Sequence, residues 1–508
     1  EGNIFTGLSI DTIMVYVENQ PLIESGKLLV QYDPFALLQQ EVNIVELTLD
    51  NPSINIIRGS DSVWNIEKFV KKKTTEKDTA PSPWAVFAKH FQLNNGTVRV
   101  IDSLSFANNS FSFIPDSLFP PSINYSDIHL KNVNIELTGM YSEKEQEISL
   151  KNISCTIPLS QSDKDFVIQK ISGKISHTPQ KTIIDNFIFT TAKSYLQFST
   201  TLKGKDVFTL STLQELKNSF VKLDISPSTI TSEDVQVFLP VLYFLKGDVL
   251  LNTSMEGTFS NININALDIA TYQNIIHANG KIKNLHSPQD LFLEINSNRN
   301  IFYLSDIKKF LPYFPIPEYS ELGKIETNFQ YKGKPLDFSA KGKISTASGV
   351  FDFDGSMDLT KPLLTYNINL AGKKANIKTF LNENAPTSNI NFTSSIKGEG
   401  VAIENLSANM NVVIDSSSLN GIPISTLQTN IAAHKKNITG DITFRSPQGN
   451  GEFDIEMNFV QKPFYTIKGN VQKLNLAPIM KDEYYTSDCS FGVDIKTDNL
   501  VPLNANLS

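Results

Sequence analysis

The sequence is poor in the residues from which catalytic, metal and nucleic-acid sites are usually built. It has two cysteines and six histidines, and none of them lies at metal-ligand spacing with another. Charged residues make up 19% of the chain and the net charge is −8, so no basic surface suited to nucleic acid is expected. No P-loop, dinucleotide fingerprint or Gly-x-Ser-x-Gly motif occurs. We therefore expect a protein that is not an enzyme, holds no cofactor or metal, and binds no nucleic acid.

The two cysteines, Cys155 and Cys489, stand far apart in the sequence. Such a pair predicts neither a zinc site nor a disulfide framework. Two buried thiols in strands are the simpler expectation, and a long-range disulfide is the alternative.

The chain also lacks a long hydrophobic run. It has no stretch of about 18 apolar residues that would cross a membrane as a helix, and no signal peptide. It begins EGNIF, without methionine, and stops within a strand-like pattern at VPLNANLS. We expect a piece of a longer protein whose targeting or anchoring segment lies outside this sequence.

What the sequence does have is alternation. The segment from Ile325 to Lys332 places apolar or aromatic residues and polar residues at every second position, and many other segments do the same. A period of two is typical of antiparallel strands with one dry face and one wet face. The chain has 33 Phe and 2 Trp, and Phe suits either a sandwich core or a wholly apolar surface. The residues expected to line the dry face are Ile325, Phe329, Tyr331, Phe351, Phe353, Met357, Ile390, Phe392, Ile396, Phe453, Ile455, Met457, Phe459, Phe491, Val493 and Ile495.

Helical patterns are few and short. They occur at 232–245, 304–314 and 374–384, near Ala477 to Met480, and over Pro83 to Phe91. Three of these segments precede a polar connector and an alternating strand, with a loose period of roughly 70 to 100 residues, which is typical of stacked units. The expected fold class is mainly β: an elongated, strongly curled antiparallel sheet that forms a repeating β-groove, with a few short helices between repeats.

One stretch, VELTLDNPSINIIRGSDSVWNIEKFV, combines a strand, Asn51-Pro52, a second strand ending at Arg58, a turn, Trp64-Asn65 and a short amphipathic helix. This arrangement resembles the N-terminal signature of the AsmA-like family of bacterial envelope proteins. Residues 91–102 resemble the next element of that family, a strand, turn and strand. Residues 419–459 are similar to the C-terminal repeats of the AsmA and TamB members of this family, which also includes YhdP-type proteins. If so, Pro52 lies where one strand hands over to the next and breaks no central ladder.

The resemblance implies a location and a function. It implies a periplasmic, bridge-like protein, anchored in the inner membrane through a helix outside this chain. Such a protein binds phospholipid acyl chains in an apolar β-groove and helps move lipid toward the outer membrane, with envelope proteins as partners. The family supplies no catalytic residues. Two alternatives stay open: a periplasmic scaffold or chaperone for outer-membrane protein assembly, and a structural or adhesive β-solenoid.

The domain organisation follows the same resemblance, which is less clear between residues 103 and 223. Residues 1–223 are expected to form an N-terminal AsmA-like region with a linker at about 71–83. Residues 224–508 are expected to form groove repeats that are truncated at the end. The sequence does not decide whether the dry faces close into a packed sandwich or stay open as a groove.

Overall fold

The structure is a computed structural model that describes residues 2–3, 7–59, 61–69, 84–102, 118–160, 162–207, 210, 212–314, 316, 319–381, 385–460 and 463–498. Strand accounts for 67% and helix for 11%, which confirms a mainly β, largely antiparallel fold with a few short helices. The linker expected at 71–83 lies outside the described residues.

The chain divides into two compact units. Unit 1 comprises Glu1–Tyr272, Asn284–Pro288 and Lys308–Pro315, and unit 2 comprises Gln273–Lys283, Gln289–Ile307 and Ile316–Ser508. This division follows contacts between Cα atoms, whereas the boundary expected at 223/224 follows a family resemblance. The second boundary therefore stays a prediction.

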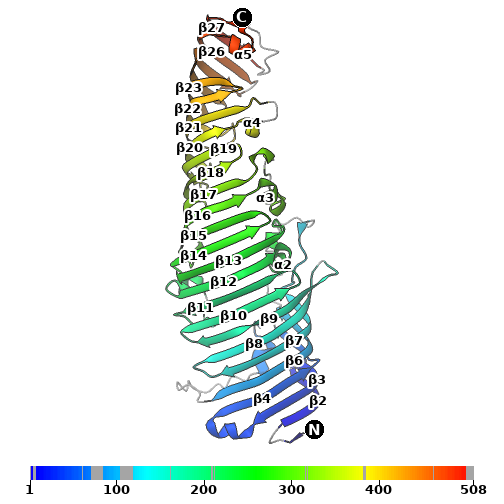
Figure 1. Ribbon diagram of the computed structural model, residues 1–508. Helices are drawn as coiled ribbons and strands as arrows, with labels where there is room; N and C mark the ends of the chain where they lie inside the picture. Colours follow the sequence, from blue (N-terminus) through cyan, green and yellow to red (C-terminus); the bar gives the residue numbers. More distant parts are fainter. Residues whose placement is uncertain are drawn as a thin grey trace. The chain divides into compact units, whose positions relative to one another are not determined.

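Unit 1 is built from strands that mostly pair with their neighbours in the sequence (Figure 1). From β6 to β14, each strand pairs antiparallel with the next. Its elements are β1 (Gly2–Asn3), β2 (Gly7–Val17), β3 (Gln20–Asp33), η1 (Pro34–Gln39), β4 (Glu41–Asp50), β5 (Ser53–Arg58), α1 (Asn65–Phe69), β6 (Ala85–Asp102), β7 (Asp127–Tyr141), β8 (Gln146–Pro158), β9 (Asp165–Thr178), β10 (Lys181–Thr191), β11 (Tyr195–Lys203), η4 (Leu213–Leu216), β12 (Phe220–Thr231), α2 (Ser232–Phe238), η5 (Pro240–Leu242), β13 (Asp248–Thr258) and β14 (Asn261–Thr271).

The handover at Pro52 is present in the structure. Strands β4 and β5 follow one another along the same edge of β6 and both run parallel to it. Pro52 lies between them, and its carbonyl accepts a hydrogen bond from the Thr97 N–H at 2.7 Å. Because proline supplies no N–H, the gap between two strands is a position where it interrupts no ladder. The expected short helix after Arg58 is α1.

Two expectations for the following segment are wrong. Residues 85–91 form the start of β6 and not a helix, and β6 continues to Asp102 without a turn. The turn-like pair Asn94-Asn95 is absorbed as a bulge, in which Asn95 has φ 52° and its N–H donates to Asn134 Oδ1 at 2.9 Å. Asparagine tolerates this left-handed conformation better than most residues. Pairing with β4 therefore overrides the local helical pattern.

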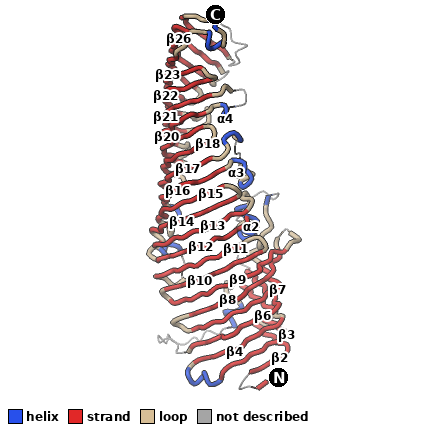
Figure 2. The backbone as a smooth tube through the Cα atoms, in the orientation of Figure 1, coloured by secondary structure: helices blue, strands red, loops and turns tan. Residues whose placement is uncertain are grey.

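Unit 2 holds a run of antiparallel strands in sequence order, and in Figures 1 and 2 α4 and α5 lie on the same side of them. Its elements are β15 (Asn274–Lys283), β16 (Phe292–Phe302), η7 (Ser320–Leu322), β17 (Ile325–Lys334), β18 (Asp337–Thr346), β19 (Gly349–Asp358), β20 (Thr365–Ala375), α4 (Lys378–Leu381), β21 (Ser388–Glu399), β22 (Ser407–Leu419), β23 (Ile422–His434), β24 (Asn437–Ser446), β25 (Gly449–Asn458), β26 (Phe464–Leu474), α5 (Ala477–Met480), η8 (Glu483–Tyr485) and β27 (Cys489–Thr497). Two further short helices, η6 (Pro288–Asp290) and α3 (Leu304–Phe310), each contain residues of both units.

Unit 2 contains an internal repeat in which β19, β20, α4 and β21 correspond to β25, β26, α5 and β27. The hydrogen bonds that close the two helical connections match. Ser388 Oγ accepts from the Ile377 N–H at 2.7 Å, and Ser487 Oγ accepts from the Leu476 N–H at 2.8 Å. A serine that satisfies the free backbone groups of a strand-to-helix corner fixes its path. The helix-then-strand repeat expected from the sequence is therefore built by the same local contacts twice.

A recurrent bulge precedes each of the helices α3, α4 and α5. At each bulge a basic residue with φ between 55° and 58° breaks the register, and its N–H donates to an Asn or Ser side chain of the following strand. Bulges of this kind bend a strand and increase its twist. The three pairs are Arg299 with Asn328, Lys374 with Asn391, and Lys473 with Ser490.

Candidate functional site: the apolar face of unit 2

Strand register in unit 2 aligns apolar side chains into four rows that cross β17 to β27. Residues directly opposite in neighbouring strands share a face. We call this surface the apolar face. The row nearest α4 and α5 is called the helix-side row. The row at the opposite ends of the strands is called the hairpin-side row, and two middle rows lie between these two.

The four rows are defined by the following residues. The helix-side row contains Ile344, Phe351, Gly372, Phe392, Ile414, Leu427, Phe444, Gly451, Val471 and Phe491. The hairpin-side row contains Phe338, Met357, Tyr366, Gly398, Ala408, Ala433, Ile438, Met457, Tyr465 and Thr497. The middle rows include Phe329, Phe353, Leu370, Val412, Ile442, Phe453 and Val493, and Tyr331, Ile368, Ile396, Met410, Ile431, Ile455, Ile467 and Ile495.

The register brings most of the sequence-derived lining residues together in these rows. Ile325, Ile390 and Phe459 lie outside them. Ile325 is on the same face at the start of β17, Ile390 lies opposite Ala375 beyond a bulge, and Phe459 follows β25 in a loop. Sequence reasoning missed the small residues of the rows, such as Gly372, because glycine carries no periodicity signal.

The side chains of the apolar face are half-buried and not enclosed. Among the described residues of unit 2, the fully buried hydrophobic residues are Leu322, Ala375, Ile390 and Val471. Gly372 and Gly451 are buried as well, the other apolar members of the four rows keep part of their surface open, and Phe491 is 47% exposed. Residues between two packed sheets would be buried from both sides. This face therefore packs within its own sheet, without a second layer over its middle rows in the described part of the chain.

The aromatic rings of this face lie flat across glycines. A Cβ atom built on Gly372 would lie 2.1 Å from the Phe392 ring, and one built on Gly451 would lie 2.3 Å from the Phe444 ring. A Cβ atom on Gly469 would lie 2.6 Å from Phe453 Cδ1. Each ring thus occupies the space above a strand that has no side chain there. The rings therefore form a flat apolar surface. Side chains that pointed away from the sheet would instead interdigitate with an opposing layer.

The helix side of the apolar face is covered beside α4, whereas Phe491 at the β27 end of the helix-side row is exposed. Helix α4 places Phe380 against Phe351, with ring centroids 5.9 Å apart, and against Tyr319 at 5.7 Å. Thr379 Oγ1 lies 2.7 Å from Ser348 Oγ, which holds the helix to the β18–β19 turn. Phe380 is 38% exposed. Helix α4 therefore covers one edge of the apolar face, and its own outer surface is exposed to solvent.

Tyrosines lie in the hairpin-side row and in the middle row beside it. Tyr331 stacks on Phe338 at 4.8 Å and its hydroxyl donates to the Lys334 carbonyl at 2.8 Å. Burial, with the nearby Asp337 charge as a smaller cause, raises the pKa of the Tyr331 phenol above its ordinary value. Tyr465 lies edge-on to Phe459 at 5.9 Å. Rings with an apolar body and a polar tip suit a boundary between hydrocarbon and water.

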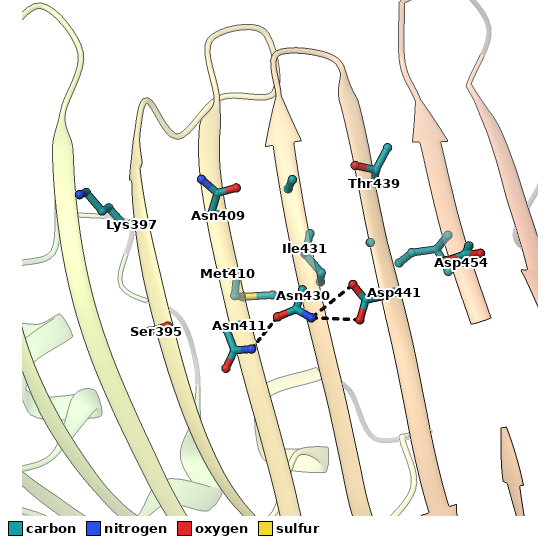
Figure 3. Close-up of a pocket in the computed structure, with 13 residues that line it drawn as sticks. Ser395, Lys397, Asn409, Met410, Asn411, Asn430, Ile431, Thr439, Asp441 and Asp454 are labelled. Carbon is teal, nitrogen blue, oxygen red and sulfur yellow. Dashed lines mark hydrogen bonds between the residues drawn. The ribbon is translucent and has the colours of Figure 1, made fainter. Parts of the chain in front are cut away.

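The opposite face of the same strands is polar. Figure 3 shows a shallow hollow there, crossed by a ladder in which Asn411 Nδ2 donates to Asn430 Oδ1 at 2.6 Å and Asn430 Nδ2 donates to Asp441 Oδ2 at 3.0 Å. These side chains satisfy one another and face solvent. No group of three or more described His, Cys, Asp or Glu residues could hold a metal ion. The ladder thus joins β22, β23 and β24 on their polar face.

Unit 1 closes its own apolar face with protein. The Phe238 ring at the end of α2 packs edge-on against Phe166 at 5.4 Å. The Ile123 N–H donates to the Val237 carbonyl, and the Tyr125 hydroxyl donates to the Phe238 carbonyl at 2.9 Å. The cluster beneath consists of Leu93, Ile123, Val133, Cys155, Ile157, Phe166, Ile168 and Val237, all of them buried. Helix α2 therefore covers the apolar face of β6 to β9.

Both cysteines are free thiols. Cys155 is buried in the unit 1 cluster, as expected, and burial raises the pKa of its thiol. Cys489 is half-buried, which differs from the expectation of two buried thiols. Over the described residues, the helices all fall short of the length and apolar character that crossing a membrane requires.

Comparison with known proteins found no matching family model, no matching curated protein and no matching solved structure. The likeness to the AsmA-like family therefore stays a resemblance based on the residues quoted above. The functional argument depends on the geometry of the apolar face.

Proposed function

We propose that this chain binds the acyl chains of phospholipid on the apolar face of unit 2 and helps lipid move between the two membranes of a bacterial envelope. The supporting observation is that aromatic rings of the apolar face lie over glycines and that the described residues place no second layer above the middle rows. Large apolar patches left in contact with water usually mark an interaction site. A hydrocarbon chain is a suitable cover because it needs no hydrogen-bond partners.

The size of the hydrophobic term supports this occupant. Each methylene removed from water contributes roughly 0.8 kcal/mol, so ten methylenes contribute at most about 8 kcal/mol before the cost of ordering the lipid. The rows change little in character from β17 to β27. Displacement from one strand to the next would exchange similar contacts, so movement needs no nucleotide or metal within this chain.

The cellular setting belongs to the same proposal. A lipid-binding chain that resembles the AsmA-like family would work in the periplasm. It would be held at the inner membrane by an anchor outside this sequence and would meet envelope proteins near the outer membrane. This setting would make it part of outer-membrane biogenesis.

The test replaces one ring of the apolar face by a charge and places the same charge on the polar face as a control. Phe329→Glu puts a carboxylate in a middle row, and Gln330→Glu puts one on the adjacent exposed position, opposite Lys341. We expect Phe329→Glu to reduce the phospholipid that co-purifies, measured by native mass spectrometry, with unchanged far-UV circular dichroism. Gln330→Glu should retain lipid. Unfolding of the first variant would instead identify the face as a closed core.

The alternative function, capture of extended strands during outer-membrane protein assembly, would use a free sheet edge, which can receive an added strand. This reading predicts binding of an unfolded barrel strand with little co-purified lipid, which the same measurement separates from lipid binding.

A further inference from the structure

We propose that phospholipid lies across unit 2 with its polar group at the hairpin side of the apolar face and its tails directed along the strands toward α4 and α5. The inference rests on the proposed function, and it assigns the headgroup to one edge and the tail ends to the other. The two edges differ in two respects, and the distance between them suits the length of a lipid tail.

The first difference is coverage. The buried hydrophobic residues Ala375 and Ile390 lie beside α4, and Val471 belongs to the helix-side row. Phe380 extends over Phe351 at this edge. A charged headgroup placed there would lose water without gaining a partner, which is unfavourable. A methyl-terminated tail has no such penalty.

The second difference is a repeated pair of tyrosines on the hairpin side. Tyr366 lies opposite Met357, and Tyr465 lies opposite Met457 at the equivalent position of the internal repeat. Both rings are half-buried, and neither hydroxyl has a hydrogen-bond partner among the described residues. A tyrosine of this kind keeps its ring on the apolar surface and offers its hydroxyl to a polar ligand. The ester or phosphate oxygens of a lipid provide the missing acceptor.

The distance between the two edges suits a lipid tail. Six residues separate Phe351 in the helix-side row from Met357 in the hairpin-side row, which is about 20 Å along a strand. The hydrocarbon of one leaflet is about 15 Å thick, half of a typical bilayer core. A tail that starts beside Tyr366 and follows the strands thus ends near the edge covered by Phe380. Lipids placed in this way lie side by side across the sheet.

Photolabelling with two probes tests this orientation. One phosphatidylethanolamine carries a diazirine at the end of an acyl chain, and the other carries it on the headgroup. After irradiation with the purified chain, we expect the tail probe to label peptides containing Phe351, Phe380 or Phe392. The headgroup probe should label peptides containing Tyr366 or Tyr465. The opposite pattern, or equal labelling of both edges, overturns the orientation while leaving lipid binding intact. Absence of labelling by both probes overturns lipid binding itself.

A conservative variant tests the tyrosines separately. Tyr366→Phe combined with Tyr465→Phe keeps both rings and removes both hydroxyls. We expect the affinity for phosphatidylethanolamine to fall between about fivefold and 150-fold, the range for two lost hydrogen bonds. Tyr484→Phe is the matched control, because Tyr484 is 88% exposed outside the four rows, and it should bind as the parent does. Unchanged affinity in the double variant would overturn the role of the hydroxyls.

Discussion

Replacing one buried ring and one ring of the apolar face by alanine distinguishes an enclosed core from an open surface. Phe166 belongs to the buried cluster of unit 1, where it is 7% exposed and packs against Phe238. Phe453 belongs to a middle row of unit 2, where it lies over Gly469 and parallel to Phe444. The two substitutions remove the same atoms from different surroundings.

The expected magnitudes follow from those surroundings. Phe166→Ala leaves a cavity under α2, and large-to-small changes of this kind cost about 3 to 5 kcal/mol of unfolding free energy. Phe453→Ala opens no enclosed cavity, because the space above its ring already meets solvent. Only the transfer contribution of the half-buried ring is lost, about 1 to 2 kcal/mol.

Native-state hydrogen exchange measures both effects within one chain. A chain with two compact units need not unfold in a single step, so one global midpoint is ambiguous. Exchange of the amides in β8 and β9 reports the local opening free energy around Phe166, and exchange in β25 and β26 reports it around Phe453. Equal losses of 3 kcal/mol or more at both sites would show that the unit 2 face is an ordinary closed core, and the lipid proposal would fail.

Three further predictions concern separate features. Gly372→Ala should displace the Phe392 ring and lower the local opening free energy by about 1 to 3 kcal/mol, measured by hydrogen exchange of the amides in β20 and β21. Gly492→Ala, whose nearest atom would be 3.6 Å away, should have little effect on exchange in β26 and β27. Equal effects would contradict the flat packing of the rings. The hydrogen bond from Arg99 holds the pKa of Asp127 below its usual 3.8, so the pair stabilises the fold above about pH 4 and loses this contribution as the pH falls further. Arg99→Gln should therefore flatten the acid side of the stability profile slightly, and an unchanged profile would show that the pair contributes nothing. In the folded chain, Cys155 should react with N-ethylmaleimide at least about tenfold more slowly than Cys489, because the Cys155 thiol is buried and its pKa is raised. Mass spectrometry measures the two rates, and equal rates would contradict the burial of Cys155.

Local chemistry in the sequence was sufficient to predict a mainly β chain whose strands have one apolar face and one polar face. Alternation from Ile325 to Tyr331 matches β17, in which half-buried and exposed residues alternate. Pro52 marked a handover between strands because proline cannot supply a ladder N–H. The helix expected at 83–91 failed, since a short apolar run fits both periods and only pairing with β4 selects the strand.

The open or closed state of the apolar faces was decided only by the tertiary structure. The pattern of apolar residues is alike where α2 covers β6 to β9 and where β22 to β26 keep their middle rows uncovered. Alternation reports which side chains share a face, but it carries no information about what lies above that face. Coverage depends on where a distant segment such as α2 packs and on glycines that let rings lie flat. Sequence alone therefore determined a two-faced sheet, and long-range packing determined which parts of its apolar face are covered.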